Sequence, residues 1–381
     1  MDYHFTEEQG LLRDAFAQFA KEEIAPHAAA WDAEDHVPMD IVPKLGEMGI
    51  MGVFVPEEYG GAGLGHIERC MALEEIARYW AGLAMMVFTH HLGVAAIVDY
   101  GTEEQKQKWL PGMCDGSCVC GLAVTEPGGG SDVAGLKTEA VLEDGTWTIN
   151  GRKCFITNAQ VADFFVVTAM TDKTQGTRGM SAFLVYKGTP GLSVGNHEDK
   201  MGIRTSITSD LLLEDVRIPV ENRLGEEGTG FYTAMKTLDL ARMWCAVIGV
   251  GVCQRCVDEA AVYAQQRVTF GKPIWKHQAI QFMLADMEIR TQASRALCAN
   301  AITLADMGVP FTTEASAAKC FTGDSAVKNA LDAIQIFGGY GYSREYPVEK
   351  LLRDAKIFQI FEGTNEVQRI VIARNTIGKF E

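Results

Sequence analysis

Three long helical stretches in the C-terminal part of the sequence constrain the fold more than any other feature. Apolar residues recur at helical spacing over residues 231–266, 276–307 and 313–337, and a glycine follows each of the last two stretches. Helices of this length bury their apolar faces most readily against one another, and shorter helices nearer the C-terminus complete the set. The sequence therefore predicts a C-terminal four-helix bundle in a domain of residues 229–381.

The N-terminal part, residues 1–117, is also helical in its pattern. Its most apolar run, residues 83–98, is short for a membrane span and carries His90 and His91, so it predicts a buried helix. Histidines on an apolar helix are usually packed and hydrogen-bonded, and we assign these two no catalytic role. An N-terminal α-helical domain is therefore expected.

The middle part, residues 118–228, changes from helical spacing to short runs with strand composition. Residues 147–156 are expected to form a hairpin whose turn is the Asn150-Gly151 pair. Other runs are bounded by Gly, Pro or Asp and read as strands: residues 164–170, 181–186 and 210–218. The predicted fold class is therefore α+β and multidomain, with a small central β-barrel or sandwich domain between two helical domains.

The overall composition limits the partners and the location of the protein. Of the 381 residues, 47% are hydrophobic and 22% charged, and the net charge of −16 argues against nucleic acid or an anionic membrane as a partner. The ten cysteines are scattered without zinc-site spacing, so we expect buried free thiols, a reducing compartment and no metal. The N-terminus has no signal-peptide pattern, and we expect a cytoplasmic protein without membrane insertion.

A carboxylate near the C-terminus is the first candidate for chemistry. A helix is expected from Pro347 to about Phe358, and a second helix begins where Thr364 or Asn365 can cap it. Glu362 lies on the loop between them among apolar neighbours, which would desolvate it and raise its pKa, as a general base requires. The same residue would also suit a purely structural role, because an acidic side chain is favoured beside a helix start.

Three further segments have the composition of ligand-binding sites. Residues 125–132, Thr-Glu-Pro-Gly-Gly-Gly-Ser-Asp, follow a strand-like run and could present N–H groups to a ligand, or form an ordinary turn. Asp239 and Arg242 share a helix face and could bind a ligand or form a solvated ion pair. Residues 267–278 are locally basic and would suit a pyrophosphate or a solvated loop.

Several short motifs near the C-terminus together resemble the signature of the flavin-dependent acyl-CoA dehydrogenases. They are residues 335–342, 346–349, 353–356 and 361–364, and matching motifs extend from about Phe5 to Arg374. The resemblance implies FAD as cofactor and an acyl-CoA thioester as substrate, with Glu362 removing the α-proton while the β-hydride passes to flavin N5. Some members of the family carry the base at the position of Ala241 instead, with glycine in the loop, so the base is assigned to Glu362.

The resemblance also implies which residues contact the ligands. Phe155 stands where many members have tryptophan, and Gly129 where the usual pattern has alanine; stacking survives the first change, whereas an indole N–H bond does not. The segments at 267–278 and 335–339 are expected to reach the FAD of a neighbouring subunit. The implied FAD contacts are Leu122, Val124, Thr125, Ser131, Phe155, Ile156, Thr157, Arg267, Thr269, Phe270, His277, Gln278, Gln335, Ile336, Gly338, Gly339, Thr364 and Glu366. The implied substrate contacts are Ser131, Asp239, Arg242, Phe361 and Gly363.

The same resemblance sets the expected partners and the alternatives. A homotetramer, built as a dimer of dimers, and an electron-transferring flavoprotein as electron acceptor are expected. An acyl-CoA oxidase, an enoyl-CoA reductase and a helical interaction protein that has lost the flavin remain alternatives. No Lys or Arg occurs between Trp80 and Tyr100, on the helix expected to line the acyl pocket, so a second carboxylate on the substrate has no evident partner there. Trp244 would crowd the pocket and favour a short, branched or cyclic acyl group.

Overall fold

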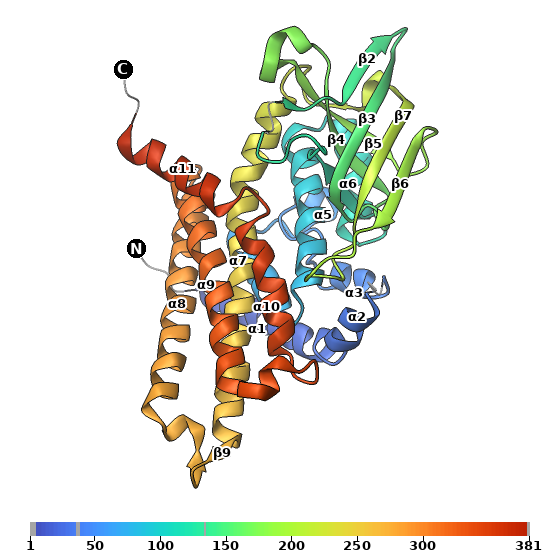
Figure 1. Cartoon of the computed structure of the whole chain (residues 1–381). Helices are drawn as coiled ribbons and strands as arrows, with labels where there is room; N and C mark the ends of the chain where they lie inside the picture. Colours follow the sequence, from blue (N-terminus) through green and yellow to red (C-terminus); the bar gives the residue numbers. More distant parts are fainter. Residues whose placement is uncertain (1–4, 36–38, 133–134, 379–381) are drawn as a thin grey trace.

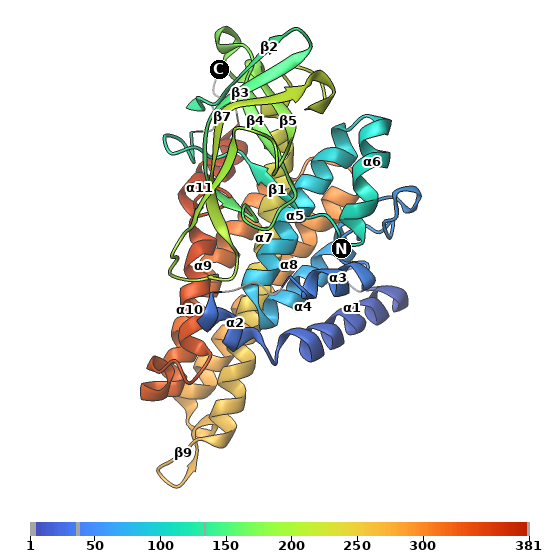
Figure 2. The same ribbon diagram turned by 90° about the vertical axis from the view of Figure 1, so that its right-hand side faces the viewer.

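The computed structural model describes residues 5–35, 39–132 and 135–378, which form two helical parts and, between them in sequence, a part built on an eight-stranded sheet (Figure 1). The ends of the two predicted terminal domains, residues 1–4 and 379–381, lie outside this range. The sheet occupies one end of the molecule, the C-terminal bundle extends away from it, and the N-terminal helices pack against the side of α7 (Figure 2). The predicted α+β multidomain architecture is confirmed.

Helix α5 forms the centre of the N-terminal part. Every residue from Ala81 to Ile97 is buried, which confirms the expected buried helix. The rings of His90 and His91 each hydrogen-bond a main-chain carbonyl oxygen through Nε2, at 3.2 and 2.8 Å. The other elements here are α1 (Glu7–Phe19), η1 (Ala20–Ile24), α2 (Ala28–Glu34), α3 (Ile41–Glu47), η2 (Glu57–Tyr59), α4 (His66–Tyr79), α5 itself (Ala81–Tyr100) and α6 (Glu103–Cys114).

The middle part is one mixed sheet whose inner face carries the aromatic core. Its strand order is β6-β7-β3-β2-β4-β5-β8, and β1 pairs with β4 in parallel. Trp147 and Phe183 meet at 5.1 Å between ring centroids, so the core is filled by large side chains. The strands are β1 (Cys120–Ala123), β2 (Glu139–Glu143), β3 (Thr146–Thr157), β4 (Phe164–Met170), β5 (Met180–Tyr186), β6 (Leu192–His197), β7 (Thr208–Pro219) and β8 (Arg223–Leu224).

The predicted hairpin turn at Asn150-Gly151 is wrong. Residues 146–157 form the single strand β3, and the turn lies at Asp144-Gly145, where both residues have positive φ (48° and 76°). Asp-Gly has the same type I′ preference as Asn-Gly, so composition alone could not choose between the two pairs. Gly151 instead marks a shift in the β3–β7 register, where an added Cβ would come within 2.3 Å of Thr138 Oγ1.

The C-terminal part contains the long helices that the sequence predicts. Helix α7 (Gly230–Gln266) runs the length of the molecule and contacts both of the other parts. Both α5 and α7 are long and apolar enough to span a membrane, yet most of each is buried inside the protein. The remaining elements are β9 (Val268–Thr269), β10 (Lys272–Pro273), η6 (Ile274–Lys276), α8 (Gln278–Asp306), α9 (Thr312–Phe337), η7 (Gly338–Tyr342), α10 (Val348–Lys356), η8 (Ile357–Gln359) and α11 (Asn365–Ile377).

All ten cysteines are free, and nine of them are buried. Among the described residues, no group of three or more His, Cys, Asp or Glu side chains is arranged to hold a metal ion.

A buried ion pair ties the glycine-rich segment to the sheet. Lys153, fully buried on β3, donates to Glu126 Oε1 at 2.9 Å and to the Val124 carbonyl oxygen at 3.0 Å. Glu126 also accepts main-chain N–H bonds from Lys137 (2.6 Å) and Thr138 (2.9 Å). Removing one partner would leave a buried charge alone, which is strongly destabilising.

We expect Glu126→Ala to lower the free energy of unfolding by about 3–5 kcal/mol, because Lys153 is then left unpaired in the interior. Glu139→Ala is the matched control, since its ion pair with Lys173 is exposed and should contribute no more than about 1 kcal/mol. Urea denaturation followed by tryptophan fluorescence measures both. Equal shifts for the two variants would contradict the structural role of the buried pair.

Candidate active site

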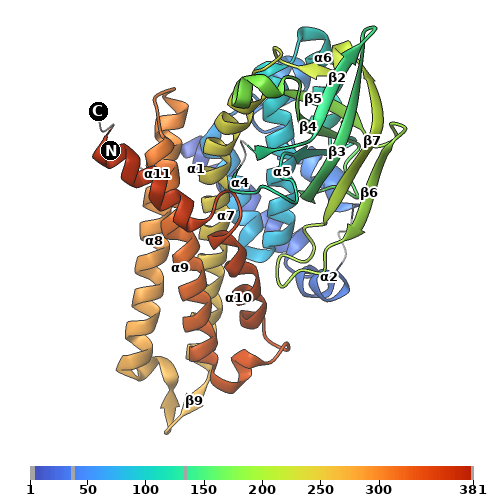
Figure 3. The ribbon, with the colours of Figure 1, turned by 45° about the horizontal axis from the view of Figure 1, so that its top comes forward.

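Glu362 lies on a strained turn between η8 and α11. The segment that joins α10 to α11 passes beside α7 (Figure 3). Its φ is 53° and that of Gly363 is 84°, so two consecutive residues adopt left-handed conformations. For a residue other than glycine this conformation costs about 1–2 kcal/mol, and such strain gathers at functional sites. Thr364 then caps α11, its hydroxyl accepting the N–H of Val367 at 3.3 Å. The cap predicted from the sequence is confirmed.

Buried polar side chains hold this turn in place. Lys319 of α9 is 1% exposed and donates to the Gly363 carbonyl oxygen at 2.7 Å and to Asn365 Oδ1 at 3.0 Å. Gln368 of α11 is fully buried and donates to the carbonyl oxygens of Glu362 and Gly363 at 3.2 and 3.0 Å. The main chain at the carboxylate is therefore fixed from two helices.

Neither Lys319 nor Gln368 was identified from the sequence. Lys319 stands on the apolar face of the predicted 313–337 helix, next to Ala315 and Ala318. A lysine at such a position must find acceptors in the interior, and this was the signal that could have marked it.

The environment of Glu362 raises the pKa of its carboxyl to near neutral pH. The side chain is half-buried, and desolvation raises the pKa of its carboxyl to about 7, while the charges of Lys319 and Arg242 pull the pKa down. A carboxyl with this pKa is deprotonated in a large fraction of molecules near pH 7 and still basic enough to accept a proton.

Helix α7 brings the predicted substrate pair to the same region. Asp239 and Arg242 form an ion pair on one face of the helix, and Thr312 Oγ1 donates to Asp239 at 2.8 Å. Nε of Arg242 has no hydrogen-bond partner among the described residues. Phe361 is half-buried, with its ring edge-on to Phe358 at 5.3 Å. Phe361 and Gly363 flank Glu362 in the chain, and Arg242, paired with Asp239, is close enough for its charge to act on the Glu362 carboxylate.

Two segments of the middle part lie side by side and present an aromatic ring outward. The Cys154 N–H donates to the Thr125 carbonyl oxygen at 2.9 Å, which joins the glycine-rich segment to β3. A register shift between Lys153 and Ile156 turns Phe155 outward, with φ at 55° and 66% of its surface exposed. Ile156 is buried, Ser131 is exposed, and the remaining predicted contacts here are half-buried: Leu122, Val124, Thr125 and Thr157.

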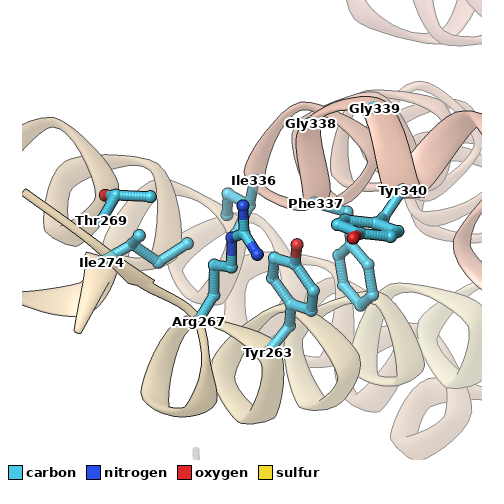
Figure 4. Close-up of a pocket in the computed structure, with 9 residues that line it drawn as sticks. All are labelled: Tyr263, Arg267, Thr269, Ile274, Ile336, Phe337, Gly338, Gly339 and Tyr340. Carbon is cyan, nitrogen blue, oxygen red and sulfur yellow. The ribbon is translucent and has the colours of Figure 1, made fainter.

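A separate cavity of about 460 Å³ lies at the C-terminal end of α7. Figure 4 shows the residues that line it. Its wall includes the Arg267 guanidinium, which lies 5.5 Å from the centre of the Tyr340 ring. Five predicted cofactor residues line it, namely Arg267, Thr269, Ile336, Gly338 and Gly339. The other four predicted in this region are not part of the wall: Phe270, which is 95% exposed, His277, Gln278 and Gln335.

The structure does not bring these two sets of predicted FAD contacts together. The wall of the cavity includes Thr269 of β9, and Phe155 belongs to β3. Strand β9 lies at the end of the bundle and β3 in the sheet at the opposite end of the molecule (Figure 1). Thr364 and Glu366 belong to neither set, since they lie at the start of α11 beside Glu362. The two sets therefore belong to different parts of the chain.

The chemistry of the two sets nevertheless suits the two halves of FAD. An exposed aromatic ring beside a segment rich in N–H groups fits a flat, hydrogen-bonding ring system. A guanidinium beside Gly338 and Gly339, where the main chain can approach closely, fits a pyrophosphate.

Comparisons with known proteins agree over the whole chain. The family descriptions of the acyl-CoA dehydrogenase N-terminal, middle and C-terminal domains match residues 6–117, 121–216 and 228–377. A short-chain specific acyl-CoA dehydrogenase of Clostridium acetobutylicum is 42% identical, over 98% of this chain and 99% of the relative.

Two solved structures are similar over the full length of this chain. One is the butyryl-CoA dehydrogenase of Megasphaera elsdenii, with a TM-score of 0.97 and 41% identity, covering 99% of this chain and 100% of the other. A chain in the structure of the electron transferring flavoprotein of Acidaminococcus fermentans has a TM-score of 0.98 and 43% identity, covering 100% of both chains.

Domain matches that span almost the entire sequence, full-length relatives above 40% identity and the three-part fold all agree. The chain belongs to the acyl-CoA dehydrogenase family and is a flavoprotein oxidoreductase that uses FAD.

Proposed function

We propose that the chain removes two hydrogens from the α and β carbons of a short acyl-CoA thioester, with Glu362 as the base that takes the α-proton. Bound FAD supplies the acceptor for the hydride from the β-carbon. The observation that carries the proposal is the half-buried carboxylate of Glu362, with its pKa near 7, on a turn fixed by buried hydrogen bonds. An α-proton is too weakly acidic to leave without such a base and without stabilisation of the resulting enolate.

The main chain at Glu362 could also stabilise the enolate. The N–H group of Glu362 donates to no described residue, while its carbonyl oxygen accepts a hydrogen bond from Gln368. An available N–H next to the base is positioned to donate to a thioester carbonyl oxygen, in the manner of an oxyanion hole. The Arg242 guanidinium, with its partnerless Nε, is a suitable donor for the CoA portion.

The separation of the two FAD-binding sets supports assembly into an oligomer. If each FAD lies on the middle part of one subunit and against the 267–278 and 335–339 segments of another, both sets are used. We propose a homotetramer, a dimer of dimers, in which subunits complete one another's cofactor sites. An electron-transferring flavoprotein is the proposed electron acceptor, consistent with the Acidaminococcus fermentans neighbour, and the cytoplasm is the proposed location.

The interior between α5 and α7 supports a small acyl group. Trp244 is fully buried on α7, and its ring meets that of Phe88 on α5 at 6.5 Å. Two large rings leave little room for a long chain, and the Clostridium and Megasphaera relatives carry short-chain and butyryl names. We propose a short, branched or cyclic acyl group.

Replacing Glu362 with Gln should keep the flavin bound but slow substrate oxidation by about 10²–10⁴, the usual contribution of a positioned base. Anaerobic mixing with butyryl-CoA measures this as the rate of flavin bleaching. Glu143→Gln, an exposed change of the same kind at the end of β2, should bleach at the normal rate. Near-normal bleaching by Glu362→Gln would remove Glu362 from its role.

The pH dependence of the reaction should follow the ionisation of Glu362. Because the base must be deprotonated, we expect kcat/KM to rise roughly tenfold per pH unit below a pKa of about 7 and to level off above it. Steady-state assays from pH 5 to 9 check this. A profile that levels off near the ordinary pKa of a glutamate would show that burial does not control the base.

Replacing Lys319 with Met should move that profile to higher pH and lower the plateau rate. The ammonium charge lowers the pKa of Glu362, so its removal lets the pKa rise, and the turn at Gly363 loses a hydrogen bond. Lys319→Arg keeps the charge and should stay nearer the wild-type profile. If both variants react more slowly but the pKa of the profile is unchanged, Lys319 stabilises the turn and does not set the pKa of Glu362.

A further inference from the structure

Arg69 of α4 is a charged side chain in the interior with no polar partner. It is fully buried, and its Nε, Nη1 and Nη2 atoms make no hydrogen bond to any described residue. Nor does any described carboxylate form an ion pair with it; Asp99 and Asp306 influence it only through their charge. A buried guanidinium normally has acceptors for its N–H groups, so this one calls for an acceptor that the chain itself does not supply.

The groups around Arg69 are aromatic and neutral. Its guanidinium carbon lies 3.1 Å from the centre of the Phe54 ring and 3.9 Å from that of Trp244, so the group is held between two ring faces. Burial, with the charge of Arg69, lowers the pKa of both nearby histidines, to about 4 for His66 and well below the usual value for His91. The rings attract the cation but accept none of its in-plane N–H bonds, and the histidines bring no negative charge.

Trp244 links Arg69 to the region of the base. The next residue, Cys245, has the pKa of its thiol raised by burial and, to a smaller extent, by the carboxylate of Glu362. Arg242, one turn earlier, is among the charges that act on Glu362. Arg242 and Cys245 are therefore close enough to Glu362 for their charges to interact, and Trp244, which lies between them in the sequence, contacts Arg69.

Phe88 marks the contact between α5 and α7, where the proposed function expects the acyl group. Its ring meets Trp244 from α5. An acyl group whose α-carbon is at Glu362 and which extends between these helices approaches the Trp244–Arg69 pair with its far end.

We infer that Arg69 recognises a carboxylate at the far end of the acyl group, and that the substrate is the mono-CoA thioester of a short dicarboxylic acid. A planar guanidinium can bind a carboxylate through two parallel N–H bonds, and a group held between two rings keeps its in-plane donors free for one. The inference rests on the proposed function and narrows its substrate class. Residues 80–100 contain no Lys or Arg that could pair with a second carboxylate on the substrate. Arg69 of α4 would provide that partner.

The test is an anaerobic titration of the wild-type FAD enzyme with two matched series of CoA thioesters. One series carries dicarboxylic acyl groups of four to seven carbons, and the other monocarboxylic groups of the same lengths; flavin bleaching and Kd are measured. At one length, the dicarboxylic thioester should bind roughly ten to a hundred times more tightly than its monocarboxylic match, as a buried charge-assisted pair requires. The methyl ester of that ligand, which has the same shape but no charge, should lose the advantage.

Arg69→Met should abolish the preference and leave bleaching by the monocarboxylic series in place. Arg13→Met, the same change at a more exposed site on α1, should leave the preference unchanged. If Arg69→Met does not fold, the comparison of the free acid with its methyl ester on the wild-type enzyme decides alone.

The outcomes separate this inference from the function on which it rests. If monocarboxylic thioesters bleach the flavin while the dicarboxylic series binds no better at any length, or the methyl ester binds equally well, the role of Arg69 is refuted and the dehydrogenase proposal stands. If no thioester of either series bleaches the flavin, both are refuted.

Discussion

The hydrogen bond from the buried Lys319 ammonium to the Gly363 carbonyl oxygen is the contact on which the proposed catalytic region depends. A carboxylate acts as a base near neutral pH only where water is largely removed, and a loop without water needs other donors for its carbonyl oxygens. Lys319 and Gln368 provide these donors and hold Glu362 in a conformation that a glutamate would not otherwise prefer. The ammonium charge also limits how far the pKa of the base can rise, so one side chain sets both position and proton affinity.

The fold was largely predictable because its elements are long or follow one another in clear blocks. Helices α7 and α9 and strand β4 lie close to their expected bounds, since apolar periodicity over many residues leaves little choice. The hairpin turn was misplaced because two pairs only four residues apart, Asp144-Gly145 and Asn150-Gly151, carry the same local signal. Only the pairing of β3 with β7 separates a turn from a shift in register, and this pairing is not local in sequence.

The candidate site was predictable only where chemistry and local sequence coincide. Glu362 lies in a recognisable motif between two helices, and Asp239 and Arg242 share a helix face. Lys319 and Arg69 belong to no such motif. A single cation in an apolar helical pattern indicates that it needs a buried acceptor, but the acceptor or neighbour comes from segments far away in the sequence. The role that we infer for Arg69 depends on Phe54 and Trp244, which come from different parts of the chain.

Helix α7 gives the proposed assembly a mechanical property. With 37 residues it is about 55 Å long at 1.5 Å per residue, and it carries Arg242 beside one subunit's base and is followed directly by Arg267 at the far cavity. In a dimer that shares its cofactors, this single rod would connect one catalytic centre to the flavin of the other. Release of the flavin at one site would then loosen the C-terminal end of α7, while the section of the same helix around Arg242 serves the second site. The two sites would therefore lose order together.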